Sequence, residues 1–163
     1  TGAAWDLIGR KRDVKILPPY TGTHSSDWYK GTADAIYQNL WYIQRYHPKN
    51  VVILSGDHIY NMDYWKMIQY HQEKNADLTI ATRHVPREEA SRFGIMTVNQ
   101  EHEIVQFQEK PAEPNSTLAS MGVYVFNAEV LIDRLQRDAK DPVSQHDFGG
   151  DIIPDMIDEH VHV

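Results

Sequence analysis

The chain contains no cysteine and no apolar run that approaches about 18 residues. The lack of cysteine excludes a disulfide framework and a zinc–thiolate site, and it suits a cytosolic protein. The lack of a long apolar run leaves no candidate for a signal peptide or a membrane span. We therefore expect a soluble, cytoplasmic protein that makes no use of a membrane.

Basic residues are also few, because 16 Lys and Arg stand against 23 Asp and Glu, which gives a formal net charge of −7. No cluster of Lys and Arg offsets this balance. The charge argues against a surface built to attract nucleic acid or anionic membrane, although it allows a local basic pocket for phosphate. With 163 residues and 41% hydrophobic content, the chain can form a single core that buries roughly 70% of its unfolded surface.

Both ends of the chain suggest that it is part of a longer protein. It opens on Thr1-Gly2-Ala3-Ala4 without an initiator methionine, and it closes on Val161-His162-Val163, an alternation typical of a strand that is just beginning.

The stretch 51–60 is the centre of the predicted fold. Four apolar residues, Val51 to Leu54, precede Ser55-Gly56, and Asp57 follows. The pattern predicts a strand buried on both faces, of the kind found in parallel sheets between helices. Asp57 would then stand at the carboxyl end of the strand, where open α/β sheets bind ligands and where a carboxylate can hold Mg²⁺ against phosphate. Spacing alone equally allows Asp57 to cap a helix that starts near Met62.

Strand and helix patterns alternate along the chain. Helices are predicted over 32–46, 62–74, 128–137 and 151–159, with a short helix that ends at Gly94. Strands are predicted over 14–17, 51–54, 78–82, 95–98, 103–108 and 121–126, and the pair around residues 99–100 predicts a hairpin. The first helix should place Ile36, Leu40 and Ile43 on one apolar face. The second has Met62, Trp65 and either Ile68 or Gln69 at helical spacing. We expect Trp28, Trp41 and Trp65 in the core or in a pocket wall.

Six motifs, taken in their order and spacing, resemble the glucose-1-phosphate adenylyltransferases, also called ADP-glucose pyrophosphorylases. They lie at 28–35, 55–60, 88–94, 109–111, 118–122 and 146–149, and read WYKGTADA, SGDHIY, EEASRFG, EKP, LASMG and HDFG. The resemblance covers almost everything from about Ile16 to Glu159.

The resemblance implies an α/β fold: a Rossmann-like nucleotidyltransferase sheet flanked by helices, incomplete at both ends, with residues 1–163 as part of the domain. It implies transfer of an adenylyl group from ATP to glucose 1-phosphate, which gives ADP-glucose and pyrophosphate for glycogen or starch synthesis. Family members carry a Gly-rich loop with Arg near their N-terminus, a second metal-binding Asp further on and a C-terminal β-helix domain. None is within this sequence, so we expect the 163-residue chain alone to be inactive and the longer protein to form a homo- or hetero-oligomer.

By motif match, Asp57 would be the Mg²⁺ ligand, Glu109 would accept hydrogen bonds from glucose hydroxyls, and Lys110 would meet the sugar phosphate. The chemistry agrees, because nucleotidyl transfer needs positioning and charge neutralisation rather than a protein nucleophile. Lys110 suits phosphate as a point charge, and Glu109 offers two acceptor oxygens. Taken alone, the sequence Glu-Lys-Pro more often marks a strand that ends at the proline and has no functional role. Together with the Asp57 motif, the functional interpretation is favoured.

The same resemblance implies that Gly94 and Ser120 line the glucose site and that Tyr29 with the turn Gly31-Thr32 borders the nucleotide-sugar pocket. Each glycine also has a plain structural alternative. Gly31 before a helix is often a turn residue, and Gly94 after one is usually a C-cap.

Two alternatives stay open at this point. The protein could make another sugar nucleotide, such as a UDP- or dTDP-sugar, or it could be a non-catalytic regulatory subunit that keeps the fold. His146-Asp147 could suggest a catalytic dyad, but no nucleophilic elbow accompanies it, so a turn-and-cap role is favoured. The nine histidines show no zinc motif, which favours surface or packing roles for them.

Overall fold

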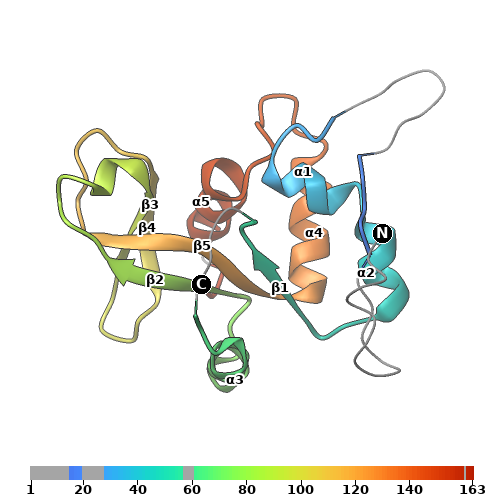
Figure 1. Cartoon of the computed structure of the whole chain (residues 1–163), viewed down its shortest axis with the longest axis horizontal. Helices are drawn as coiled ribbons and strands as arrows, with labels where there is room; N and C mark the ends of the chain where they lie inside the picture. Colours follow the sequence, from blue (N-terminus) through green and yellow to red (C-terminus); the bar gives the residue numbers. More distant parts are fainter. Residues whose placement is uncertain (1–14, 20–27, 57–60, 160) are drawn as a thin grey trace.

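The computed structural model of the protein describes residues 15–19, 28–56, 61–159 and 161–163. Asp57 lies outside these residues. Within them, helices cover both faces of a five-stranded sheet (Figure 1). This arrangement confirms the predicted α/β class, a sheet flanked by helices.

The sheet is organised around its longest described strand, β5 (Leu118–Asn127). β1 (Asn50–Leu54) and β2 (Leu78–His84) both run antiparallel to β5, and both of their registers include Val125. Because a strand has only two edges, β1 and β2 lie on opposite edges of β5.

β3 (Gly94–Val98) pairs with Ala119 of β5. β2 pairs with the same residue from the other edge of β5. β3 therefore shares the edge of β5 that β1 occupies further along. β1 ends where the amide of Ser55 donates to the carbonyl of Gly122, at 3.0 Å. The carboxyl end of β1 and the amino end of β3 thus face each other across residues 120–122 of β5.

β4 (Ile104–Glu109) completes the sheet as the partner of β3, at one end of the molecule (Figure 1). The side chain of Asn99 shapes the turn between them, since its Oδ1 accepts hydrogen bonds from the amides of Glu101 and Glu103 at 3.0 and 2.9 Å. Asn and Asp favour turns through such local bonds. The predicted hairpin is confirmed.

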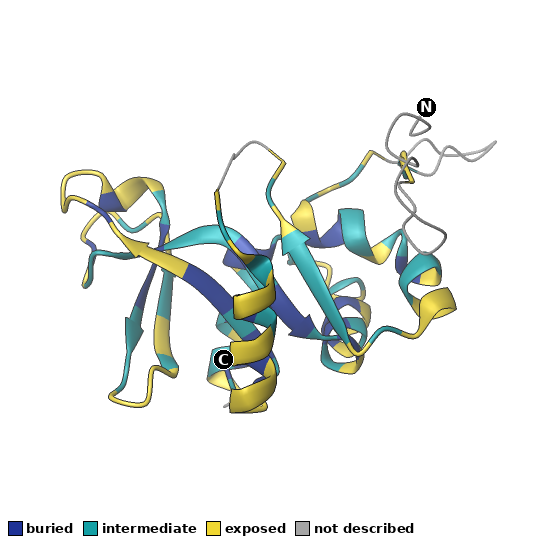
Figure 2. Ribbon diagram, turned by 60° about the horizontal axis from the view of Figure 1, so that its bottom comes forward, coloured by how far each residue is buried: buried dark blue, intermediate teal, exposed yellow. Residues whose placement is uncertain are grey.

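The core of the described residues forms three clusters, and alternate strand residues place the two that include the middle of β5 on opposite faces of the sheet. On one face, Met67 of α3 (Tyr64–Lys74) packs against Val123 and Val125 of β5. The buried residues of α3 lie on the side that faces the sheet, as in an amphipathic helix. The opposite side of the helix is exposed to solvent (Figure 2).

The larger cluster fills the opposite face. The helices that cover it are α1 (Thr32–Tyr37), α2 (Leu40–Tyr46), α4 (Ala128–Asp138) and α5 (Ile153–Asp158). The predicted apolar face of the first helical region is confirmed, because Leu40 is buried and Ile36 and Ile43 pack against the same cluster.

Side-chain caps mark the starts of α3 and α4. Asp63 accepts a hydrogen bond from the amide of Trp65 at 3.1 Å and starts α3, and Asn127 accepts from the first amides of α4. Asp63 therefore fills the capping role that spacing alone allowed for Asp57.

The predicted helix 32–46 is two helices. Between α1 and α2, the side-chain amide of Asn39 donates to the carbonyl of Ala35 and to the hydroxyl of Tyr29, both at 2.9 Å. Asparagine competes with helical bonds in this way, so the helix breaks at this residue.

The last predicted helix, 151–159, begins earlier than expected. A π-helical turn, η3 (Phe148–Ile152), leads directly into α5, and Asp147 caps it. The short helix predicted before Gly94 is a single 3₁₀ turn, η2 (Ala90–Arg92).

Two strand expectations are wrong in part. Residues 15–17 of the predicted strand 14–17 are irregular, and Ile16 is 70% exposed. β1 is not buried on both faces, since its residues are half-buried and Leu54 is exposed. Among the described strands, β1 pairs only with β5 and in antiparallel sense, so it lacks the two neighbours that bury a strand of a parallel sheet.

The tryptophan expectation is also wrong. Trp28, Trp41 and Trp65 are 78%, 55% and 61% exposed. On α3, Met67 and His71 are buried, whereas Trp65 is exposed. Met62 and Ile68 of the predicted set pack against the same core cluster as Met67.

Candidate active site

A cavity of about 460 Å³ opens where β1 ends and β3 begins. Its walls come from α1, the residues after β1, η2, the facing ends of β3 and β4, the middle of β5, and η3. Strand ends of this kind are where open α/β folds bind ligands. Four other cavities among the described residues, of about 870, 790, 470 and 480 Å³, contain none of the predicted site residues.

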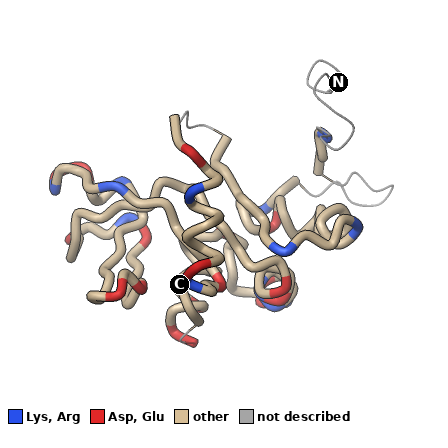
Figure 3. Tube along the Cα trace, turned by 90° about the horizontal axis from the view of Figure 1, so that it is seen from below, with Lys and Arg blue, Asp and Glu red and all other residues tan. Residues whose placement is uncertain are grey.

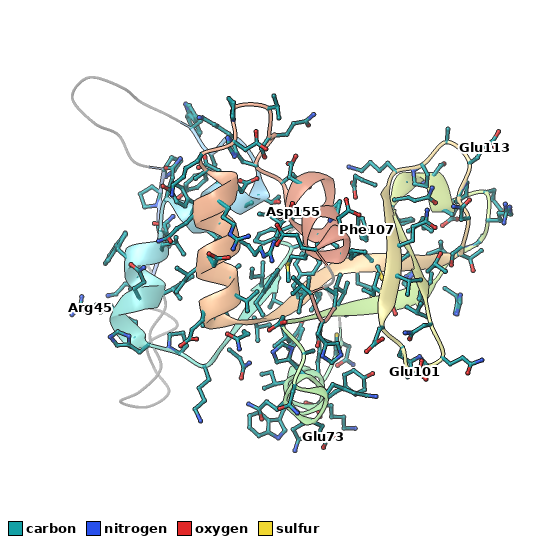
Figure 4. The ribbon with its side chains drawn as sticks, turned by 180° about the vertical axis from the view of Figure 1, so that it is seen from behind. Arg45, Glu73, Glu101, Phe107, Glu113 and Asp155 are labelled. Carbon is teal, nitrogen blue, oxygen red and sulfur yellow. The ribbon has the colours of Figure 1, made fainter. Side chains whose placement is uncertain are left out.

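Glu109, the last residue of β4, lies in this cavity between two glycines. A Cβ on Gly94 would overlap the ring of Phe107 and stand 3.0 Å from the Glu109 Oε2, and a Cβ on Gly149 would stand 2.5 Å from the same oxygen. Phe107 lies between β4 and α5 (Figure 4). The missing side chains at both glycines therefore create the space that the Glu109 carboxylate occupies.

Lys110 follows in a left-handed backbone conformation, with φ of +43°, which costs a non-glycine residue roughly 1–2 kcal/mol. Its amide donates to the carbonyl of Phe93 at 3.1 Å, and its Nζ lies 3.1 Å from the Glu109 Oε1. The hydrogen bond with Glu109, and then the charge of that carboxylate, raise the pKa of Lys110. Because its side chain is 67% exposed, the ammonium can reach a ligand in the cavity.

Asp147 joins η3 to α1. Its Oδ1 accepts hydrogen bonds from the amides of Gly149 and Gly150 at 2.9 and 3.0 Å, and its Oδ2 accepts from the Thr32 hydroxyl at 2.8 Å. The Thr32 oxygen in turn accepts from the amide of Phe148 at 3.1 Å. The favoured turn-and-cap role is confirmed for Asp147, and this network fixes Gly149 where it contacts the Glu109 carboxylate.

Tyr124 and Ser120 lie on the same face of β5 and share a hydrogen bond. The Tyr124 ring lies 5.7 Å from the ring of Phe148, centre to centre. Burial raises the pKa of Tyr124, and the carboxylates of Asp147 and Glu109 add to the effect, against the lowering by Ser120. The phenol therefore stays neutral near pH 7 and can donate a hydrogen bond.

The structure brings five of the predicted site residues to the lining of this one cavity. They are Thr32, Gly94, Glu109, Lys110 and Ser120.

Two predicted residues do not line it. Gly31 stands just before α1, where any side chain would overlap the backbone of His146, so its predicted turn role is the one that the geometry explains. The Tyr29 hydroxyl donates to the carbonyl of Leu17 at 2.8 Å and accepts from Asn39. Tyr29 thus ties the segment before it to the junction of α1 and α2.

Asp57, the predicted metal ligand, lies outside the described residues, whereas Ser55 and Gly56 just before it line the cavity. Among the described residues, no group of three His, Asp or Glu could hold a metal ion.

Sequence reasoning missed four lining residues: Arg92, Tyr124, Asp147 as a cavity residue, and Phe148. A signal existed for Tyr124, because strand alternation places it on the face of Ser120, four residues earlier. Arg92, Asp147 and Phe148 stand inside the quoted motifs, but only the fold shows that they face one cavity.

In the part of the chain that the structure describes, no helix has the length and apolar character needed to cross a membrane.

Comparison with known proteins places residues 5–163 within the family model described as nucleotidyl transferase. The chain is 56% identical over 158 residues to a protein of Geobacillus stearothermophilus named glucose-1-phosphate adenylyltransferase, covering 97% of this chain and 41% of that protein. It is 58% identical over 156 residues to a protein of the same name from Halalkalibacterium halodurans, covering 96% of this chain and 41% of that protein. The chain therefore spans about two fifths of the length of these curated relatives.

Proposed function

The chain belongs to the nucleotidyl transferase family, and from that premise we propose that it carries the glucose 1-phosphate site of a glucose-1-phosphate adenylyltransferase. The reaction transfers the adenylyl group of ATP to glucose 1-phosphate and releases pyrophosphate. The observation that carries the proposal is the adjacent pair Glu109 and Lys110, held at one end of a cavity by Gly94 and Gly149.

Glu109 and Lys110 match the two chemical halves of a sugar phosphate. The Glu109 carboxylate can accept hydrogen bonds from sugar hydroxyls, because each of its two oxygens has more than one acceptor site. The Lys110 ammonium binds the phosphate as a point charge. On binding, it would replace part of its ion pair with Glu109 by an ion pair with the phosphate.

The cavity also offers an apolar wall and a neutral donor. The rings of Tyr124 and Phe148 lie side by side at 5.7 Å, and suit the carbon face of a pyranose ring. Ser120 and the Tyr124 hydroxyl add polar contacts that fix the orientation of the sugar. Orientation matters because the sugar phosphate oxygen must attack the α-phosphorus of ATP in line with the leaving pyrophosphate.

For the metal, we propose Mg²⁺ with Asp57 as a protein ligand. Mg²⁺ commonly takes one or two carboxylates together with substrate phosphates and waters, so a cluster of three protein ligands is not required. Asp57 directly follows Gly56, which lines the cavity, and a carboxylate is the right ligand type. When bound, the ion would neutralise charge on the reacting phosphates.

Gly31, Thr32 and Tyr29 remain proposed for the nucleotide-sugar border. Thr32 lines the cavity directly, whereas Gly31 and Tyr29 would act by holding the start of α1 against His146 and Asn39. We expect the complete protein to work in the cytoplasm and to form an oligomer.

The test is the release of pyrophosphate by the protein expressed from its complete reading frame, with glucose 1-phosphate, Mg²⁺ and one nucleotide at a time. We expect turnover with ATP and little with UTP or dTTP. A preference for UTP or dTTP would support another sugar-nucleotide specificity, and glucose 1-phosphate binding without turnover would support a regulatory subunit. We expect the 163-residue chain alone to show no turnover, because preorganised charge stabilisation is usually the largest catalytic contribution and the chain spans about two fifths of the length of its relatives.

A further inference from the structure

Four charged side chains line the cavity: Arg92, Glu109, Lys110 and Asp147. Lys110 pairs with Glu109 at 3.1 Å, and Asp147 accepts from Thr32 and two backbone amides. The guanidinium of Arg92 has no hydrogen bond or ion pair with any described residue. We propose that Arg92 is a second phosphate-binding residue, which contacts the phosphate of the sugar phosphate beside Lys110; this inference rests on the proposed function.

The charge balance of the cavity favours such a role. Two basic and two acidic side chains leave the lining without net charge, and the charge of Lys110 is already shared with Glu109. A phosphate monoester carries about −1.5 to −2 charges near pH 7. Lys110 alone therefore leaves the charge of the ligand only partly balanced, and Arg92 supplies a cation that is not committed to any residue the structure describes.

The backbone places Arg92 in a segment adjacent to Lys110, the residue proposed to bind the phosphate. Arg92 ends η2, where its amide donates to the carbonyl of Glu89 at 3.0 Å. The carbonyl of the next residue, Phe93, accepts from the amide of Lys110 at 3.1 Å. The start of β3 and the end of β4 are thus bonded side by side, and the two basic residues come from adjacent segments.

Arginine is well suited to this position because its planar guanidinium can make two parallel hydrogen bonds to one phosphate and stays charged at any working pH. Basic and acidic residues are interspersed along the described chain rather than gathered into one basic surface (Figure 3). A local effect of Arg92 on one ligand is therefore expected, rather than general attraction of anions. Because Arg92 is exposed, salt and water limit the effect.

The phosphates of ATP have the same chemistry and could occupy this position. The sugar phosphate is favoured because Arg92 is connected through Phe93 and Gly94 to the residues proposed for glucose 1-phosphate, and not to α1. The experiment must therefore measure both substrates separately.

The test uses Arg92→Gln and Arg92→Lys in the protein from the complete reading frame, with Arg83→Gln on β2, outside the cavity, as the matched control. We expect Arg92→Gln to raise the KM for glucose 1-phosphate about tenfold, with kcat and the KM for ATP within about twofold. Arg92→Lys should give an intermediate KM, and the control should match wild type. The inhibition constant of inorganic phosphate against glucose 1-phosphate should rise in parallel in Arg92→Gln.

An unchanged KM for glucose 1-phosphate in Arg92→Gln, or a selective rise in the KM for ATP, would overturn the inference while leaving the proposed function intact. Failure of the wild-type protein to use glucose 1-phosphate would instead contradict the proposed function. If the melting temperature of Arg92→Gln falls, the Arg92→Lys variant decides, provided that its own melting temperature is normal. An intermediate KM for glucose 1-phosphate in Arg92→Lys would support the inference, and a wild-type KM together with wild-type inhibition by phosphate would overturn it.

Discussion

The Glu109 carboxylate lies so close to Gly149 that a Cβ on residue 149 would stand 2.5 Å from its Oε2. These two residues come from β4 and η3, and the contact sets the direction of the carboxylate at the end of its strand. Gly94 on β3 limits the same side chain from another side. The ends of β3 and β4 and the turn η3 therefore meet at the Glu109 carboxylate.

Gly149→Ala should displace the Glu109 carboxylate and raise the KM for glucose 1-phosphate by about 10- to 100-fold, since a misplacement near 1 Å can cost this much. Gly150→Ala is the matched control, because a Cβ there would meet Asp147 only at 3.8 Å, an ordinary contact. Steady-state kinetics of both variants provide the measurement. Equal effects of the two substitutions would mean that the contact with Glu109 does not position it for binding.

Lys110→Ala should chiefly raise the KM for glucose 1-phosphate and leave the KM for ATP nearly unchanged, because the lost contact is to the sugar phosphate. Lys74→Ala on α3, away from the cavity, is the control. A selective rise in the KM for ATP would show that the pair Glu109 and Lys110 serves the other substrate.

Asp57→Asn keeps the shape of the side chain and removes the charge proposed to hold Mg²⁺. Turnover should fall by orders of magnitude, with substrate affinities changed much less. Asp63→Asn is a close control, since Asn also caps helices well and Asp63 caps α3. Near-normal turnover of Asp57→Asn would exclude the metal role.

The buried His71 should make the free energy of unfolding depend on pH. Its ring is buried, its Nδ1 lies 2.9 Å from the Thr79 hydroxyl, and burial lowers its pKa against an opposing effect of Asp77. The unfolded chain, with a His pKa of about 6.5, therefore binds the proton first. The contribution of His71 is complete above about pH 6.5 and is lost as the pH falls toward the lower folded-state pKa.

Urea unfolding of the chain between pH 7.5 and 5 tests this, with His71→Asn and His84→Asn compared. His84 contacts Thr117 through the same atoms at 3.1 Å but is exposed, so His84→Asn is the matched control for the loss of a His–Thr contact without burial. His71→Asn should be less stable at pH 7.5 and should lose less stability on acidification. Parallel pH profiles for wild type and His71→Asn would contradict the role of burial.

Much of the fold followed from local patterns in the sequence. The strands, the hairpin and the face that contains Leu40 are visible because alternation and helical spacing report local geometry. The break at Asn39 and the antiparallel pairing of β1 with β5 were not visible, because the first depends on a side-chain bond to Ala35 and the second on contacts between distant segments.

The candidate site was predictable only in part for the same reason. Motifs identified Glu109, Lys110 and Gly94, but the contact with Gly149 depends on how η3 packs against the end of β4. Tyr29, by contrast, is part of a motif but does not line the cavity, and its hydroxyl donates a hydrogen bond to the carbonyl of Leu17.

We propose that the cavity between β1 and β3 binds glucose 1-phosphate through Glu109. Calorimetric titration of glucose 1-phosphate into the protein from the complete reading frame, with Glu109→Gln and the exposed control Glu113→Gln, tests it most directly. Glu109→Gln keeps the size of the side chain but loses one acceptor oxygen and its charge, so affinity should fall at least about tenfold while Glu113→Gln binds as wild type. Equal affinity of Glu109→Gln and wild type would contradict the account.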